Sequence, residues 1–301
     1  MKKLLTDIWE VLKLTFNKAI DDDIVTQGAA IAFYTIFSIA PLFVLVVSVG
    51  GLFLNEEMIS SQIEGYLGDF LDPAMMENLQ QFVTSRMQGD TGIVATIIAA
   101  GTLIFGATTV ISQLKATLNN IWYVGELKIH SVWNFLLSRL VSFGMIILFS
   151  GLLLLSLVAE AALAVIAGFF SDLLPEVQLD LYRYVTQFGT IVFAVLFFTL
   201  IFKILPDVHA RWLDVMVGAV VTTILFIIGK NLIGVYLTAT GIEVTYKTAG
   251  SLVIFIIWVY YNVQTILLGA VFTQVYTEKF GGSISPYRFV SLRKQVESKL
   301  K

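Results

Sequence analysis

The sequence has no cysteine and few charged residues, and both absences limit what the protein can do. Zero cysteine excludes disulfide bonds, thiolate metal sites and cysteine nucleophiles. Only 14% of the 301 residues are charged, whereas soluble domains carry about 25%. The motifs of P-loop NTPases, serine hydrolases and zinc proteases are missing, and the two histidines, His130 and His209, lie far apart. We therefore expect no enzymatic activity, no metal site, no cofactor and no nucleic-acid partner.

Long hydrophobic runs are what the sequence does have. Hydrophobic residues make up 57% of the chain, and the mean hydropathy is +0.84. Several uncharged runs exceed the roughly 18 to 20 residues that cross a hydrocarbon core of about 30 Å. The pattern predicts an all-α, polytopic integral membrane bundle with six transmembrane helices. These are expected at residues 28–54, 93–114, 140–168, 185–205, 215–236 and 249–274.

The distribution of lysine and arginine predicts the orientation of this bundle. Of the 19 basic residues, 15 fall in four segments that six spans would place on one side, and positively charged loops stay in the cytoplasm. These segments are residues 1–27, 115–139, 203–214 and 275–301. Both termini are therefore predicted to be cytoplasmic. A single membrane domain, residues 28–274 with a long outer loop at 55–92, lies between an N-terminal segment and a basic tail.

The N-terminal segment, residues 1–27, has helical periodicity but is not a secretory signal. Leu4, Ile8, Leu12 and Phe16 recur at every fourth position, with lysines elsewhere. No uninterrupted apolar core or small-residue cleavage site follows the first lysines. Two interpretations remain open: a helix lying in the headgroup plane of the membrane, or an amphipathic helix packed on the bundle.

Lys230 is the only charged residue among the 28 between Asp214 and Glu243. With Asp214 as the inner boundary of its span, Lys230 lies about 24 Å further along a straight helix, toward the outer half of the bilayer. A buried ammonium costs at least about 2.5 to 3.5 kcal/mol there, so it usually has a partner or lines a substrate path. Asn231 lies at the edge of the same polar stripe, which we expect to face protein or water. Alternatively, Lys230 snorkels to the outer headgroups.

Other spans carry residues that would suit the same path. Glu160 is the other charge in a long apolar run, so it either pairs with Lys230 or is solvated at the end of its span. Pro41 should kink the first span, with Ser38 available to satisfy the freed backbone; broken helices form substrate sites in many transporters, although simple kinks are commoner. Asn262 places an amide on the inward face of the last span, where holding helices together is its simpler role.

Four sequence blocks, in this order, carry a resemblance to a known family. They are AIAFYTIFSIAPLFVL (30–45), LKATLNNIW (114–122), FKILPDVHARWLDVMVGA (202–219) and YKTAGSLVIFIIWVYYNVQTILLGA (246–270). They resemble the YihY/virulence factor BrkB family of bacterial inner-membrane proteins, once described as ribonuclease BN. Lys230 and Tyr236 fall where members of the family carry a lysine and a tyrosine at the same spacing. Val271 departs from the family, because many members have an acid there, and a mechanism built on that acid is not expected in this chain.

The resemblance implies a multi-pass protein of the bacterial inner membrane and not a ribonuclease. Family associations with the cell envelope imply a transporter or flippase for a lipid-like or anionic envelope precursor, with membrane lipids as its partners. Lys230, Glu160 and the break at Pro41 would then line the path. Two alternatives stay open: a cation/proton antiporter, for which Glu160 is the candidate titrating acid, and a non-transporting scaffold of envelope assembly. The sequence does not predict an oligomeric state.

Overall fold

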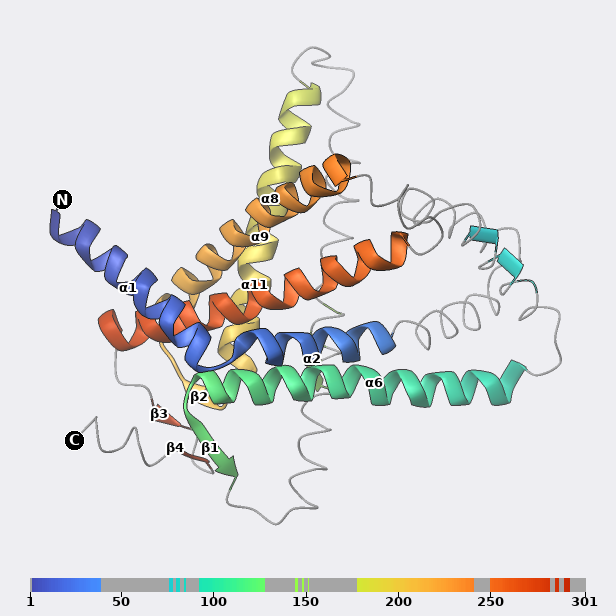
Figure 1. Cartoon of the computed structure of the whole chain (residues 1–301), viewed down its shortest axis with the longest axis horizontal. Helices are drawn as coiled ribbons and strands as arrows, with labels where there is room; N and C mark the ends of the chain where they lie inside the picture. Colours follow the sequence, from blue (N-terminus) through green and yellow to red (C-terminus); the bar gives the residue numbers. More distant parts are fainter. Residues whose placement is uncertain are drawn as a thin grey trace. The chain divides into compact units, whose positions relative to one another are not determined.

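The described part of the protein consists mainly of helices. The computed structural model describes residues 2–38, 76, 77, 80, 81, 84, 92–127, 144, 145, 148, 151, 178–240, 250–281, 285, 286 and 290–292 (Figure 1). The helices are α1 (Lys2–Asp21), α2 (Ile24–Phe37), α6 (Gly92–Ile121), α8 (Gln178–Ile204), α9 (Trp212–Thr240) and α11 (Gly250–Phe280). The predicted helical class is therefore confirmed, with short strands added to it.

Three of these helices are long and apolar enough to cross a membrane. The candidate spans are Gln187–Ile204, Trp212–Ile233 and Val253–Phe280. They coincide with the last three spans that the sequence predicts. α6 covers the predicted second span and continues beyond it to Ile121. Most of the predicted first and third spans and most of the outer loop lie outside the described residues, so the total of six stays a prediction.

The chain divides into two compact units. Unit 1 contains Met1–Gln27, Ile111–Ile227 and Gln264–Lys301, and unit 2 contains Gly28–Val110 and Ile228–Val263. All four segments that the sequence places on one side of the membrane belong to unit 1. Described residues of these four segments are joined by hydrogen bonds, ion pairs and short strand pairings.

The end of α6 is tied to the connection between α8 and α9. The Asn119 amide nitrogen donates to Asp207 Oδ2 (2.9 Å), and the Asp207 backbone N–H donates to Asn119 Oδ1 (2.8 Å). Lys115 adds an ion pair of 2.9 Å to Asp207 Oδ1. The backbone N–H and both carboxylate oxygens of Asp207 are thus satisfied, as partly buried polar groups require.

Two short antiparallel ribbons bring the segment after α11 to the same region. β1 (Val124–Leu127) pairs with β4 (Val290–Leu292), and β2 (Val208–His209) pairs with β3 (Ser285–Pro286). The sequence analysis did not predict these strands, because segments of two to four residues are too short to show an alternating pattern.

The N-terminal helix α1 packs on unit 1 through a face beside its apolar stripe. Val11 and Thr15 are buried, whereas Ile8 and Phe16 of the stripe are 49% and 65% exposed. The apolar stripe therefore does not pack against the described protein. One face of α1 thus packs on the protein while its apolar stripe is exposed, so both interpretations of this segment stay predictions.

Charged contacts hold α1 against the ends of α6 and α11. Lys279, in the last turn of α11, lies 2.6 Å from Glu10 Oε2. Lys18 forms an ion pair of 2.9 Å with Asp22 and lies 3.8 Å from the centroid of the Tyr123 ring. The start of the chain and the end of the last candidate span are therefore neighbours in unit 1.

The helices α9 and α11 approach closely in unit 1, because glycines on each helix accommodate threonines of the other. A Cβ atom at Gly218 would lie only 2.7 Å from the Cβ of Thr273, and one at Gly269 would lie 2.9 Å from the Cβ of Thr222. Small residues allow such close approach between membrane helices. We name this contact the α9–α11 seam; it comprises Asp214, Gly218, Thr222, Gly269, Thr273, Thr277 and Gly281.

Gly218→Ala is expected to lower the free energy of unfolding by roughly 1 to 3 kcal/mol, because the added methyl group overlaps Thr273. Gly189→Ala on α8 is the matched control, since no atom lies within 4 Å of its added Cβ. This control should be neutral or slightly stabilising. Thermal unfolding of the purified protein in detergent measures both variants. Equal unfolding temperatures would contradict close packing at Gly218.

Asn119→Ala removes both hydrogen bonds to Asp207 and leaves a backbone N–H unpaired, so a loss of about 1 to 3 kcal/mol is expected. Asn17→Ala, an exposed amide on α1, is the control and should change stability little. The same unfolding assay reports both. A stable Asn119→Ala protein would mean that the pair with Asp207 does not hold this connection.

Candidate functional site

Three of the residues predicted to line a path lie in the same stretch of α9 and α11 in unit 2. Lys230 and Asn231 are exposed on α9, and Asn262 lies half-buried on α11. Gly229 on α9 packs against the ring of Tyr261 on α11. Lys230 follows Gly229 and Asn262 follows Tyr261, so this contact brings the two stretches of chain into one region. Helical spacing alone did not establish this juxtaposition.

Lys230 lies inside a candidate span, three residues before its end at Ile233. It has no ion-pair partner among the residues that the structure describes. Glu160, its predicted partner, and Pro41, the predicted break, both lie outside the described residues. Their pairing and the kink therefore stay predictions.

Asn262 and Ser38 both use their side-chain donors within their own helices. The Asn262 amide nitrogen donates to the carbonyl of Trp258 (2.6 Å), so this donor does not cross to another helix. The Ser38 hydroxyl donates to the carbonyl of Tyr34 (2.8 Å). This carbonyl lies about one turn before that of Phe37, which Pro41 would leave without a backbone donor. Ser38 also lies against Gly106 of α6: a Cβ atom added to Gly106 would lie 3.2 Å from the Cβ of Ser38.

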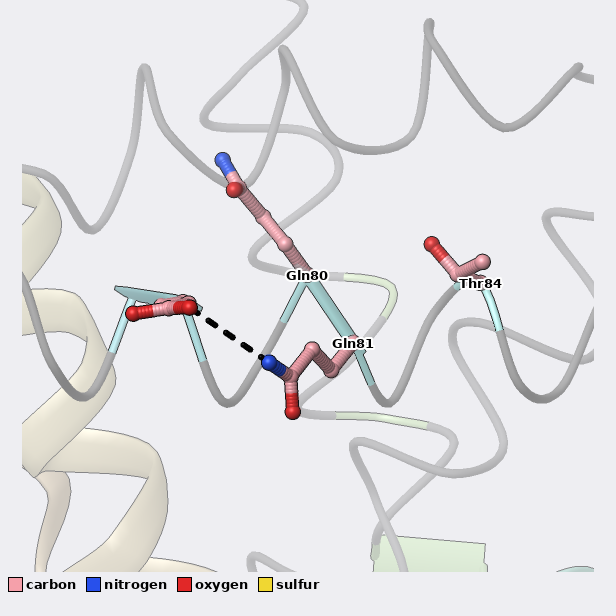
Figure 2. A pocket seen from close by; sticks show the side chains of 4 residues that line it. Gln80, Gln81 and Thr84 are labelled. Atoms are coloured by element: carbon pink, nitrogen blue, oxygen red, sulfur yellow. Dashed lines mark hydrogen bonds between the residues drawn. The ribbon is translucent and has the colours of Figure 1, made fainter.

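A surface pocket in unit 2 is lined by Glu77, Gln80, Gln81 and Thr84, within the predicted outer loop (Figure 2). The Gln81 amide nitrogen lies 3.5 Å from Glu77 Oε1, along the dashed line in the figure. Glu77 is the only charged residue among the described residues of its lining. Of the predicted path residues that the structure describes, Lys230, Asn231, Ser38 and Asn262, none lines it.

Unit 1 contains a more unusual feature, which is a polar interior around the α9–α11 seam. Every residue of α11 between Val263 and Thr277 is buried or half-buried, and the buried ones include several polar residues. The buried polar residues of α9 and α11 are Asp214, Thr222, Thr223, Thr265, Thr273, Gln274 and Thr277. Polar side chains inside a membrane bundle are costly and are frequently functional.

Several polar atoms in this interior have no hydrogen-bond partner in the part of the chain that the structure describes. They are Asp214 Oδ2, both amide atoms of Gln274, Thr117 Oγ1 and Trp122 Nε1. Gln274 and Asp214 are 0% and 6% exposed. Native proteins contain few such groups, and each one indicates a missing water, an ion or a functional role.

Sequence reasoning did not identify this region as a site. Asp214 served only as the boundary of a span, and Gln274 marked the end of the last one. A signal was present, because Gln274 falls four residues after Ala270 within an otherwise apolar run. Asp214 gave no comparable signal, since an acid at the start of an apolar helix is ordinarily solvated.

Comparison with known proteins gives a family and no solved structure. A family model described as virulence factor BrkB matches residues 15–288. A UPF0761 membrane protein of Bordetella petrii is 23% identical over 88% of this chain and 57% of its own length. Relatives of the same name from Stenotrophomonas maltophilia and Pseudomonas aeruginosa are 26% and 23% identical, over 86% and 90% of this chain and 58% and 64% of their lengths. The chain thus spans about three fifths of these relatives. No solved structure matches.

The family match and the structure concern the same part of the chain. Residues 15–288 include α2, α6, α8, α9 and α11 entirely, together with the last turns of α1. Two of the resembling blocks, 114–122 and 202–219, meet in unit 1 through Asn119 and Asp207. The protein belongs to the virulence factor BrkB family, whose curated relatives carry the name of membrane proteins.

Proposed function

We propose that the protein is a six-span transporter or flippase of the bacterial inner membrane that moves a lipid-like or anionic envelope precursor. Lys230 carries the proposal, because it is an exposed ammonium within a helix long and apolar enough to cross a membrane. Such a charge needs an anionic or aqueous partner at that depth. A phosphate headgroup supplies both the opposite charge and strong acceptor oxygens.

The neighbourhood of Lys230 supports this choice of ligand. Asn231 is exposed beside it, and Asn262 lies on α11 in the same stretch of unit 2. An amide and an ammonium together can bind phosphate oxygens through several donors. No covalent chemistry is needed, so the proposed protein moves its substrate without being an enzyme.

The contacts in unit 1 support the proposed topology. Segments 1–27, 115–139, 203–214 and 275–301 contain most of the basic residues, and their described parts touch one another. An even number of spans would bring them together on one side of the membrane. Because positively charged segments remain in the cytoplasm, we assign this side to the cytoplasm.

The exposed stripe of α1 is consistent with a membrane surface beside unit 1. Trp9 is 70% exposed and Ile20 is 63% exposed, although both are apolar. A helix with its apolar face turned away from the protein fits the headgroup region of a bilayer. The antiporter alternative rests on Glu160, which lies outside the described residues, and the scaffold alternative predicts that changes at Lys230 are silent.

Lys230→Ala is expected to abolish the binding of anionic lipid that co-purifies with the gently extracted wild-type protein. It should also reduce the movement of a fluorescent anionic lipid across proteoliposomes by at least about tenfold, the equivalent of one lost charged contact of about 1.4 kcal/mol. Native mass spectrometry measures the first effect, and chemical quenching of outer-leaflet fluorescence measures the second.

Lys13→Ala is the matched control, because it removes an exposed lysine outside the candidate spans. It should retain lipid binding and movement. Lys230→Arg keeps the charge and should retain most of both. Wild-type vesicles that move lipid no faster than protein-free vesicles would contradict transport of lipid, and a fully active Lys230→Ala protein would remove Lys230 from the path.

The proposed topology is testable because the chain has no native cysteine. A membrane-impermeant maleimide should label Gln81→Cys in intact cells, since this exposed position lies in the predicted outer loop. It should label Asn17→Cys, an exposed position on α1, only after the cells are permeabilised. Labelling of Asn17→Cys in intact cells would reverse the orientation.

A further inference from the structure

Asp214 is a buried carboxylate with no ion-pair partner among the described residues. It lies in the first turn of α9, is 6% exposed, and its Oδ2 atom has no hydrogen-bond partner among the described residues. This oxygen packs directly against Gly281, at the end of α11. Burying an unpaired carboxylate is costly, so the arrangement calls for a partner of positive charge.

The partly buried lysines of unit 1 do not supply that charge. Each is engaged elsewhere in the part of the unit that the structure describes: Lys18 with Asp22, Lys115 with Asp207, Lys203 with the carbonyl of Ala210, and Lys279 with Glu10. Arg211, one turn before Asp214, is exposed. Among the described residues, no lysine or arginine therefore forms an ion pair with Asp214.

The threonine side chains of the seam beside Asp214 offer acceptors. The hydroxyl of Thr277 donates to the carbonyl of Thr273 (2.8 Å), that of Thr273 donates to Gly269, and that of Thr222 donates to Gly218. Each hydroxyl hydrogen is therefore used, and the oxygen lone pairs remain. The carbonyl of Thr277 also faces Gly281: a Cβ atom added to Gly281 would lie 2.6 Å from the Thr277 carbonyl oxygen. An environment of this kind favours a cation over an anion.

Gln274 adds a second unpartnered group on the same side of α11. It lies seven residues before Gly281, so the two share one face of the helix, about two turns apart. Its side chain is fully buried, and neither its nitrogen nor its oxygen has a hydrogen-bond partner among the described residues. A bound ion or its water shell would satisfy the amide oxygen.

We infer that Asp214 and Thr277 form a binding site for one monovalent alkali cation at the end of the α9–α11 seam, with Gln274 placed to contact the water shell of the ion. One carboxylate balances one positive charge, whereas calcium sites use several carboxylates. The negative end of the α11 dipole adds to the attraction, and helix C-terminal ends hold sodium ions in this way in broken-helix transporters. The site is separate from Lys230 and does not depend on a lipid substrate.

Thermal unfolding of the full chain in detergent, with sodium, potassium or choline chloride at constant ionic strength, tests the inference. The unfolding temperature of the wild type should rise saturably with one of the alkali cations relative to choline. Asp214→Asn should lose this response and should be at least as stable as the wild type in choline, because its uncompensated charge is gone. Asp21→Asn, an exposed acid on α1, is the control and should keep the response.

Other outcomes would overturn the inference. A wild type that unfolds at the same temperature in all three salts binds no such cation. An Asp214→Asn protein that is destabilised equally in every salt would give Asp214 a structural role only. Gln274→Leu keeps the carboxylate and should raise the half-saturating cation concentration by at least about tenfold, the loss of one water-mediated contact worth about 1.4 kcal/mol. An unchanged value would exclude the amide from the site and contradict the assignment.

Discussion

The close approach of α9 to α11 at Gly218 and Gly269 determines much of the chemistry of unit 1. Because glycine allows the backbones to come together, Thr222 and Thr273 are buried and cannot reach water. Their hydroxyl hydrogens must then go to carbonyls of their own helices. The hydroxyl oxygens of these threonines keep lone pairs that can accept a hydrogen bond or contact a cation along the seam. A packing constraint between two helices thus produces an electronegative interior, and the same residues that stabilise the pair define what it can bind.

Much of the fold was predictable from the sequence, where it depends on local composition. The apolar runs predicted α8, α9 and α11, and the basic segments predicted which parts of the chain gather in unit 1. The contacts that join those segments were not predictable. Asn119 and Asp207 are 88 residues apart, and nothing in either segment alone indicates the other. Likewise, β2 and β3 contain two residues each, so their pairing depends on the fold and not on any periodic pattern.

The candidate sites differ in the same way. Lys230 was identified because a lone charge in an apolar helix is visible in sequence, and the structure places Asn262 in the same stretch of unit 2. Asp214 was not identified, because its burial depends on Gly281, a residue 67 positions later that leaves room for the carboxylate. A charged residue inside an apolar run is visible in the sequence. An acid at the start of a helix is common, and its burial becomes visible only in the folded structure.

The two ribbons have a consequence for the order in which the protein assembles. β1 and β2 leave the ribosome before α11 is made, yet their partner strands β4 and β3 follow α11 in the chain. Both strands must therefore wait, with unpaired backbone groups, until the last candidate span has been inserted. Insertion of the helices and closure of unit 1 are separate events in time. The strands β3 and β4 pair with two earlier connections, so a nascent chain arrested before Ser285 would carry the described helices without either ribbon.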